Sequence, residues 1–119
     1  MIEIKNLSKN FNKFYALQDI NASFDDGQSI ALIGPNGCGK TTLIKCILGL
    51  NVVENGDVIV NGESVKEHYL YRNNIGYMPQ IGRYPENMSI KDTLTMIKET
   101  RNIPEKDLDT ELLQAFDLE

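Results

Sequence analysis

The sequence predicts an α/β fold: N-terminal antiparallel strands, followed by part of a parallel sheet with flanking helices. Three observations carry this prediction. A glycine-rich octet at residues 34–41, Gly-Pro-Asn-Gly-Cys-Gly-Lys-Thr, lies between an apolar run and a segment with helical periodicity. Apolar residues that recur at every second position indicate half-buried strands before the octet. The composition, with 41% hydrophobic and 24% charged residues among 119, is that of an ordinary globular chain.

The N-terminal part is predicted to form two strands. Ile2 and Ile4 alternate with polar residues, which predicts a strand over residues 2–7. Residues 10–13 are typical of a turn, and residues 17–24 carry apolar side chains at period two, which predicts a second strand.

The octet is expected to join a buried strand to a helix. Asp25-Asp26-Gly27 is a turn signal, and the continuous apolar run that follows predicts a strand over residues 29–33 that is covered on both faces. Residues 40–49 have apolar side chains at helical spacing, and Gly49 lies where a C-terminal cap is expected.

The next elements are short. Asn55-Gly56 predicts a turn, residues 57–60 a strand, and residues 63–74 a polar stretch with a short helix. Residues 75–78 are apolar and predict another buried strand, which Pro79 ends.

Two helices are predicted at the C-terminal end of the sequence. Ser89, with Asp92 three residues later, is a plausible N-cap for a helix over residues 90–101, which carries Leu94 and Ile97 on one face. Pro104 can open a last helix. The apolar stripe of that helix is predicted to consist of Leu108, Leu112 and Phe116.

The octet fits the pattern G-x-x-x-x-G-K-[ST], which is the phosphate-binding P-loop. Gly34, Gly37 and Gly39 allow positive φ angles and a close approach to a ligand, so that backbone N–H groups can form an anion-binding nest. Lys40 supplies a positive charge for the β- and γ-phosphates, and Thr41 a hydroxyl oxygen for Mg²⁺. The sequence therefore predicts a nucleotide site.

Charge, cysteine spacing and hydropathy argue against a nucleic-acid surface, a cysteine-ligated metal site and a membrane span. The net charge of −5 argues against a general nucleic-acid surface. No apolar run approaches the about 18 residues that predict a membrane span, and the N-terminus has no stretch of signal-peptide length, so we expect a cytoplasmic chain. Cys38 and Cys46 lack the spacing of metal ligands and are expected to be reduced thiols.

The chain resembles the N-terminal half of an ABC-type ATPase, the nucleotide-binding subunit of ABC transporters. Residues 34–43 are similar to that family's own version of the P-loop. Residues 4–9 and 16–20 resemble its opening strands, residues 75–80 the strand that leads into its Q-loop, and residues 84–94 the start of its helical subdomain.

The resemblance implies ATP and Mg²⁺ as cofactors. Phe11 aligns with the aromatic residue that stacks on adenine, with Phe14 and Tyr15 as open alternatives. Gln80 matches the Q-loop glutamine, so Lys40 and Gln80 would be catalytic, and Thr41 and Gln80 would contact Mg²⁺. The implied nucleotide-binding residues are Phe11, Asn36, Gly37, Cys38, Gly39, Lys40, Thr41 and Thr42.

The resemblance also implies a domain organisation and a set of partner subunits. Residues 1–83 would form a partial nucleotide-binding core, and residues 84–119 the beginning of the helical subdomain. Transmembrane subunits would dock near residues 80–97, a second ATPase subunit would complete the site, and the protein would lie at the inner face of the membrane. The family's Walker B acidic residues, its Leu-Ser-Gly-Gly-Gln stretch and its switch histidine are expected in a C-terminal half outside these 119 residues, so this chain alone should hold ATP without hydrolysing it.

Other functions are compatible with parts of the pattern. A soluble ABC-type ATPase acting on ribosomes or DNA would share the P-loop, as would a kinase or GTPase, although those two would lack the pattern at residues 75–80. A non-hydrolysing nucleotide-binding module is a further alternative. The sequence leaves the transported substance and the direction of transport open.

Overall fold

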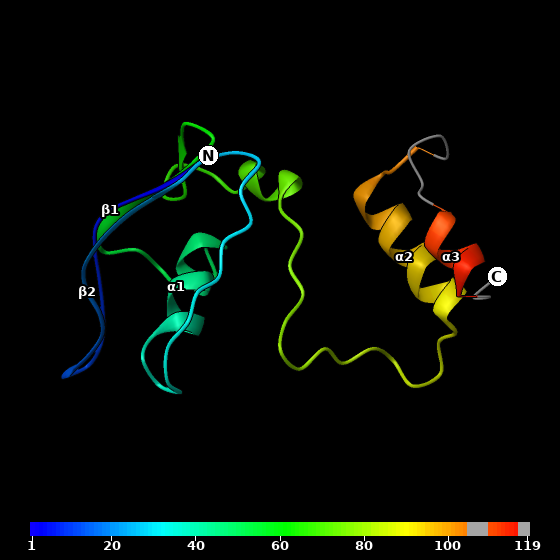
Figure 1. Ribbon diagram of the computed structural model, residues 1–119, viewed down its shortest axis with the longest axis horizontal. Coiled ribbons are helices and arrows are strands. Elements are labelled where there is room, and N and C mark those ends of the chain that lie inside the picture. Colours follow the sequence, from blue (N-terminus) through cyan, green and yellow to red (C-terminus); the bar gives the residue numbers. More distant parts are fainter. Residues whose placement is uncertain (105–109, 117–119) are drawn as a thin grey trace. The chain divides into compact units, whose positions relative to one another are not determined.

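The computed structural model describes residues 1–104 and 110–116, which divide into two compact units, Met1–Ile75 and Gly76–Glu119 (Figure 1). The first unit holds a four-stranded antiparallel sheet in the order β2-β1-β3-β4. The described residues of the second unit include two helices. Within the described ranges, no helix is long and apolar enough to span a membrane.

The sheet consists of β1 (Ile2–Phe11), β2 (Phe14–Phe24), β3 (Asn55–Val60) and β4 (Glu63–Ser64). The predicted strands at residues 2–7 and 17–24 are confirmed, and both are longer than predicted, because the hairpin continues to the turn at residues 12 and 13. Asn12 adopts a left-handed φ of 56° in this turn, a conformation that asparagine tolerates better than most residues.

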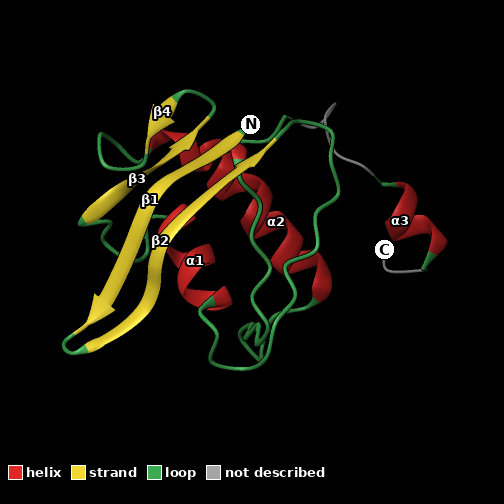
Figure 2. Cartoon of the chain, turned by 60° about the vertical axis from the view of Figure 1, so that its left-hand side comes forward, coloured by secondary structure: helices red, strands yellow, loops and turns green. Residues whose placement is uncertain are grey.

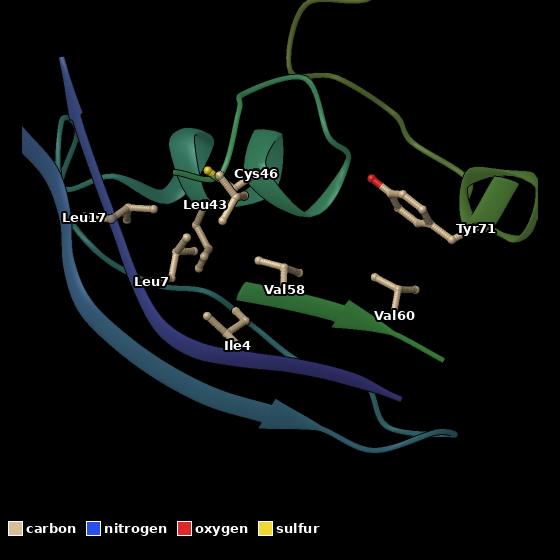
Figure 3. Packing of buried hydrophobic residues seen from close by; sticks show 9 residues of the cluster. Ile4, Leu7, Leu17, Leu43, Cys46, Val58, Val60 and Tyr71 are labelled. Carbon is tan, nitrogen blue, oxygen red and sulfur yellow. The ribbon is translucent and has the colours of Figure 1, made fainter. Parts of the chain in front are cut away.

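Helix α1 (Lys40–Ile47) packs against one face of the sheet and confirms the predicted helix after the octet (Figure 2). Leu43 of α1 points toward Leu7 of the sheet, and Cys46 and Val58 belong to the same buried cluster (Figure 3). The buried hydrophobic residues of the core are Ile4, Leu7, Leu17, Leu43, Cys46, Val53, Val58, Val60 and Tyr71. Burial of these side chains holds the start of α1 in place beneath the sheet.

A 3₁₀ helix, η1 (Leu70–Asn74), completes the first unit and confirms the short helix predicted within residues 63–74. Its Tyr71 is buried, and Arg72 Nη2 donates to the carbonyl of Gly49 at 3.0 Å. Gly49 has a φ of 67°, as expected of a glycine just after a helix.

Two predicted strands are wrong in this structure. Residues 29–33 and 75–78 are loop segments, and their apolar side chains are largely exposed, with Ile33 at 89% and Met78 at 90%. A strand requires a neighbouring strand in a hydrogen-bonded sheet, and the sheet formed by the described residues 1–104 and 110–116 includes neither segment. The apolar runs are therefore present without the sheet partners that would bury them.

The turn predicted at residues 55 and 56 is also wrong, because both residues belong to β3. Gly56 has a φ of 80° and lies at a register shift between β1 and β3. A Cβ at this position would lie 2.5 Å from the carbonyl oxygen of Lys5 and would also overlap Asn6. The glycine therefore marks a bulge rather than a turn.

In the second unit, α2 (Ile90–Arg101) begins with the predicted cap. Asp92 N donates to Ser89 Oγ at 3.1 Å, and Ser89 N donates to Asp92 Oδ2 at 3.1 Å, which forms a capping box. The hydroxyl of Ser89 also donates to Asp92 Oδ2 at 2.6 Å, and this hydrogen bond, together with that from Ser89 N, lowers the pKa of Asp92. Leu94 and Ile97 are exposed.

Helix α3 (Glu111–Ala115) occupies part of the last predicted helix. Pro104 lies outside α3. Leu108 and the side chain of Leu112 lie outside the described residues, so the predicted stripe stays a prediction.

Replacing Gly56 by alanine should destabilise the chain by about 3 kcal/mol or more, since a left-handed φ and a clash with backbone on β1 act together. Gly62 is the matched control, with a φ of 83° and open space around its Cβ position, and Gly62→Ala should cost about 1 kcal/mol. Chemical denaturation of both variants measures the difference. Equal losses would contradict the close approach of β1 and β3.

Candidate functional site

The glycine-rich octet folds around the side chain of Lys40. Lys40 Nζ donates to the carbonyl oxygens of Gly34 at 2.6 Å and Pro35 at 2.7 Å, and it lies 3.5 Å from Cys38 Sγ. A positive charge is therefore held against the backbone of the loop. This arrangement places a cation where a polyphosphate would meet the loop.

Helix α1 adds further donors at the same place. Its N-cap, Gly39, has a φ of 97° and provides no side-chain cap, and the first turn contains no acidic residue. The first N–H groups of an α-helix lack partners within the helix, and the helix dipole favours an anion there. Thr41 is exposed and Thr42 half-buried, and both lie in this first turn.

Two glycines of the loop lie close to other atoms of the chain. A Cβ at Gly34 would lie 2.7 Å from Cys38 Sγ, and a Cβ at Gly39 would lie 2.5 Å from the carbonyl oxygen of Ala16 in β2. Gly37 has a φ of 82° with open space at its Cβ position, so its requirement is conformational. The loop geometry and its donors fit a phosphate chain.

The three aromatic residues proposed for base stacking lie at the end of the β1–β2 hairpin and are all exposed. Phe11 pairs with Phe14, and Tyr15 pairs with Asn10. Directly opposed residues of two strands project to the same face, and faces alternate along a strand. Phe11 and Phe14 therefore share a face, and Tyr15 projects to the other.

The face that Phe11 shares is the one that α1 covers. Lys9, two residues before Phe11, pairs with Leu17, and both are buried, Leu17 within the core that α1 helps to form. Phe11 and Phe14 thus lie on the side of the phosphate loop, which disfavours Tyr15 as the stacking residue. The choice between the two phenylalanines was open in the sequence.

Two more predicted site residues lie outside the cluster around Lys40. Asn36 is exposed in the turn of the loop. Gln80 is an exposed residue of the second unit, so it is described apart from the phosphate loop. The predicted contacts of Gln80 with Mg²⁺ and with water stay predictions.

Sequence reasoning missed Lys9, which is only 7% exposed. Its ammonium donates to the carbonyl of Val52 at 3.0 Å and lies 3.6 Å from Glu54 Oε1. Burial raises the pKa of Cys46, and the charge of Lys9 opposes this shift. The available signal was its inward position in the alternating pattern of residues 7–11, between a core leucine and Phe11.

Comparison with known proteins identifies related sequences. A family model described as ABC transporter matches residues 17–118. The sulfate/thiosulfate import ATP-binding protein CysA of Pseudomonas aeruginosa is 43% identical over 93 residues, which cover 78% of this chain and 28% of that protein. The chain thus spans less than a third of this relative's length.

Solved structures show the same fold. The structure of an ATP-binding subunit of an ABC transporter superposes with a TM-score of 0.86 at 30% identity, covering 98% of this chain and 50% of that one. A dimeric ATP-binding cassette in a post-hydrolysis state with ADP and Pi gives a TM-score of 0.52 at 26% identity, over 57% of this chain and 31% of that one. The predicted α/β P-loop fold is confirmed by these structures.

The two thiols should react at very different rates. Cys38 is exposed, whereas Cys46 is fully buried with a raised pKa, which lowers its thiolate fraction. Ellman's reagent should modify one thiol quickly in the native chain and the second only on unfolding. Cys38→Ser should remove the fast phase, and a fast phase that persists in this variant would contradict the burial of Cys46.

Proposed function

The chain belongs to the ABC transporter family, and on this premise we propose that it binds Mg-ATP through the loop around Lys40. In the full-length protein, it would serve as the ATP-binding subunit of an ABC transporter, which hydrolyses ATP to drive transport across a membrane. The observation that carries the proposal is the ammonium of Lys40, held 2.6 and 2.7 Å from two loop carbonyls beside the uncapped start of α1.

The proposed binding of phosphate is electrostatic. Lys40 would exchange its contacts with Gly34 and Pro35 for β- and γ-phosphate oxygens, and the N–H groups of the loop and of α1 would bind the remaining oxygens. Phosphoryl transfer depends mainly on positioning and on neutralising the charge that develops on the transferred group. Lys40 and these N–H groups would therefore supply part of the positioning and charge neutralisation that hydrolysis needs.

Bound Mg²⁺ would neutralise charge on the β- and γ-phosphates. Thr41 would hold it through the hydroxyl, and Gln80 is the second proposed contact. Among residues 1–104 and 110–116, no cluster of three or more histidine, cysteine or acidic residues could hold a metal ion. This fits Mg²⁺, which keeps several waters and is shared with substrate phosphates.

The adenine base would stack on Phe11, which lies on the face of the sheet that α1 covers. The ring presents a flat apolar surface, and base–aromatic stacking is worth about 1–3 kcal/mol. Phe14, on the same face, is the second candidate.

Hydrolysis and transport would require more than these 119 residues. We propose that the chain alone binds ATP without hydrolysing it, and that residues outside it complete the catalytic site together with a second ATPase subunit. The dimeric solved cassette supports pairing. Residues 80–97 would receive the transmembrane subunits, which would place the protein at the inner face of a membrane. The name of the Pseudomonas relative supports import, with sulfate or thiosulfate as the first candidates for the transported substance.

Lys40→Ala should weaken ATP binding to the full-length protein by about 10- to 100-fold, because hydrogen bonds to charged groups contribute about 1.5–3 kcal/mol. Lys45→Ala is the matched control, since Lys45 is an exposed lysine in the last turn of the same helix. Isothermal titration calorimetry measures both affinities. Equal affinities for ATP in the two variants would rule out the proposed role of the loop.

Alkylation of Cys38 should block ATP binding, because a bulky adduct would fill the space between Gly34 and Lys40. N-Ethylmaleimide should abolish binding in the native protein, and bound Mg-ATP should slow the modification. Cys38→Ser should bind ATP and resist the reagent. Unchanged binding after complete modification of Cys38 would place the phosphates elsewhere.

A further inference from the structure

Lys9 is a buried charge in a row of inward-facing positions. Leu7, Lys9 and Phe11 alternate along β1 on the face that α1 covers, and the first two are buried. Burying an ammonium costs free energy unless it gains partners, and an apolar side chain at this position would avoid that cost. The cation therefore calls for an explanation beyond packing.

The contacts of Lys9 join two parts of the first unit. Its ammonium is tied to the segment before β3 by the carbonyl of Val52 at 3.0 Å and by Glu54 at 3.6 Å. The same ammonium lies over the ring of Phe11, 5.4 Å from the centroid. This distance is within the range of a cation–π interaction. The charge is thus fixed by the backbone on one side and contacts the aromatic ring on the other.

We propose that Lys9 is a positioning residue for the adenine base: it holds one face of Phe11 so that the other face is presented to the nucleotide. The proposal rests on the proposed function of Phe11 in base stacking. An exposed fraction of 47% for Phe11 fits a ring with one covered and one open face. Ordering the ring before the nucleotide arrives lowers the entropy cost of binding.

The contact with Lys9 also distinguishes Phe11 from Phe14, its partner across the hairpin. Phe14 lies on the same face and is 64% exposed. Phe11 is the less exposed of the two, and its ring contacts the ammonium of Lys9. Lys9 thereby selects Phe11 as the stacking ring.

The place of Phe11 suits a ligand that also reaches the phosphate loop. Ala16 lies against Gly39 at the start of α1, and Phe14, the partner of Phe11, is two residues before Ala16. At about 3.3 Å per residue, the Phe11–Phe14 pair lies roughly 7 Å along the strand from that contact. The hairpin turn and the phosphate loop lie toward the same end of the first unit in both views (Figures 1 and 2).

The test compares ATP with inorganic tripolyphosphate, which has the phosphate chain but no base, on the full-length protein. Lys9→Met keeps the length of the side chain and removes the charge. We expect it to weaken ATP binding about two- to fivefold, the lower range of cation–π contacts, since the ring of Phe11 is 47% exposed. Tripolyphosphate affinity should stay unchanged. Phe11→Ala should weaken ATP more strongly, and adding Lys9→Met to Phe11→Ala should change nothing further.

Several results would overturn the inference. Equal losses for ATP and tripolyphosphate in Lys9→Met would show a structural role, and an added loss in the double variant would show that Lys9 acts independently of Phe11. Failure of the unaltered protein to bind either ligand would instead overturn the proposed function. Normal tripolyphosphate binding with unchanged ATP affinity in Lys9→Met would overturn this inference alone.

Two further variants keep the test decisive if Lys9→Met does not fold. Lys9→Arg retains a cation that stacks on aromatic rings and should preserve ATP affinity. Glu54→Gln retains the ammonium of Lys9 and weakens its anchor at an exposed position. It should lower ATP affinity by a smaller factor without changing tripolyphosphate affinity, and no change for either ligand would count against the proposal.

Discussion

The architecture of the site depends on one close approach, that of the backbone of Gly39 to the carbonyl of Ala16 in β2. The space between them excludes even a Cβ atom, which would lie 2.5 Å from that oxygen. Through this contact, the start of α1 is tied directly to the antiparallel sheet. The sheet carries Phe11, and the helix carries Lys40. The proposed base platform and the proposed phosphate loop are thereby held at one end of one unit.

The core beneath the site maintains this geometry. Leu43 and Cys46 of α1 pack on Leu7 and Val58, so the helix cannot shift along the sheet without opening a well-packed cluster (Figure 3). Lys9 lies on the same inward face, closer to the hairpin turn. Its contacts there are with a charge and an aromatic ring and not only with apolar side chains. The transition from core to site therefore occurs within one strand, between Leu7 and Phe11.

Local signals explain which parts could be predicted. The octet, helix α1 and the capping box of Ser89 and Asp92 depend on residues a few positions apart, and all three were predicted from the sequence. The strands at residues 29–33 and 75–78 depend on distant partners, which apolar periodicity cannot supply, and both predictions were wrong for this structure.

Register explains most of what the sequence left open. Tyr15 projects from the face of the sheet opposite to the one that α1 covers. This follows from the pairing across the hairpin, which includes a register shift between Lys9 and Asn10. The bulge at Gly56 is likewise a property of two strands together. Lys9 was not predicted as a site residue, and its inward position is fixed by its register with the buried Leu17.

A crystal structure of the full-length protein with Mg²⁺ and a non-hydrolysable ATP analogue tests the central claim most directly. The claim is that one unit binds both ends of the nucleotide. We expect the triphosphate at Lys40 and the N–H groups that begin α1, with the base stacked on the open face of Phe11. A base that contacts Tyr15, or a triphosphate bound away from Lys40, would contradict the account.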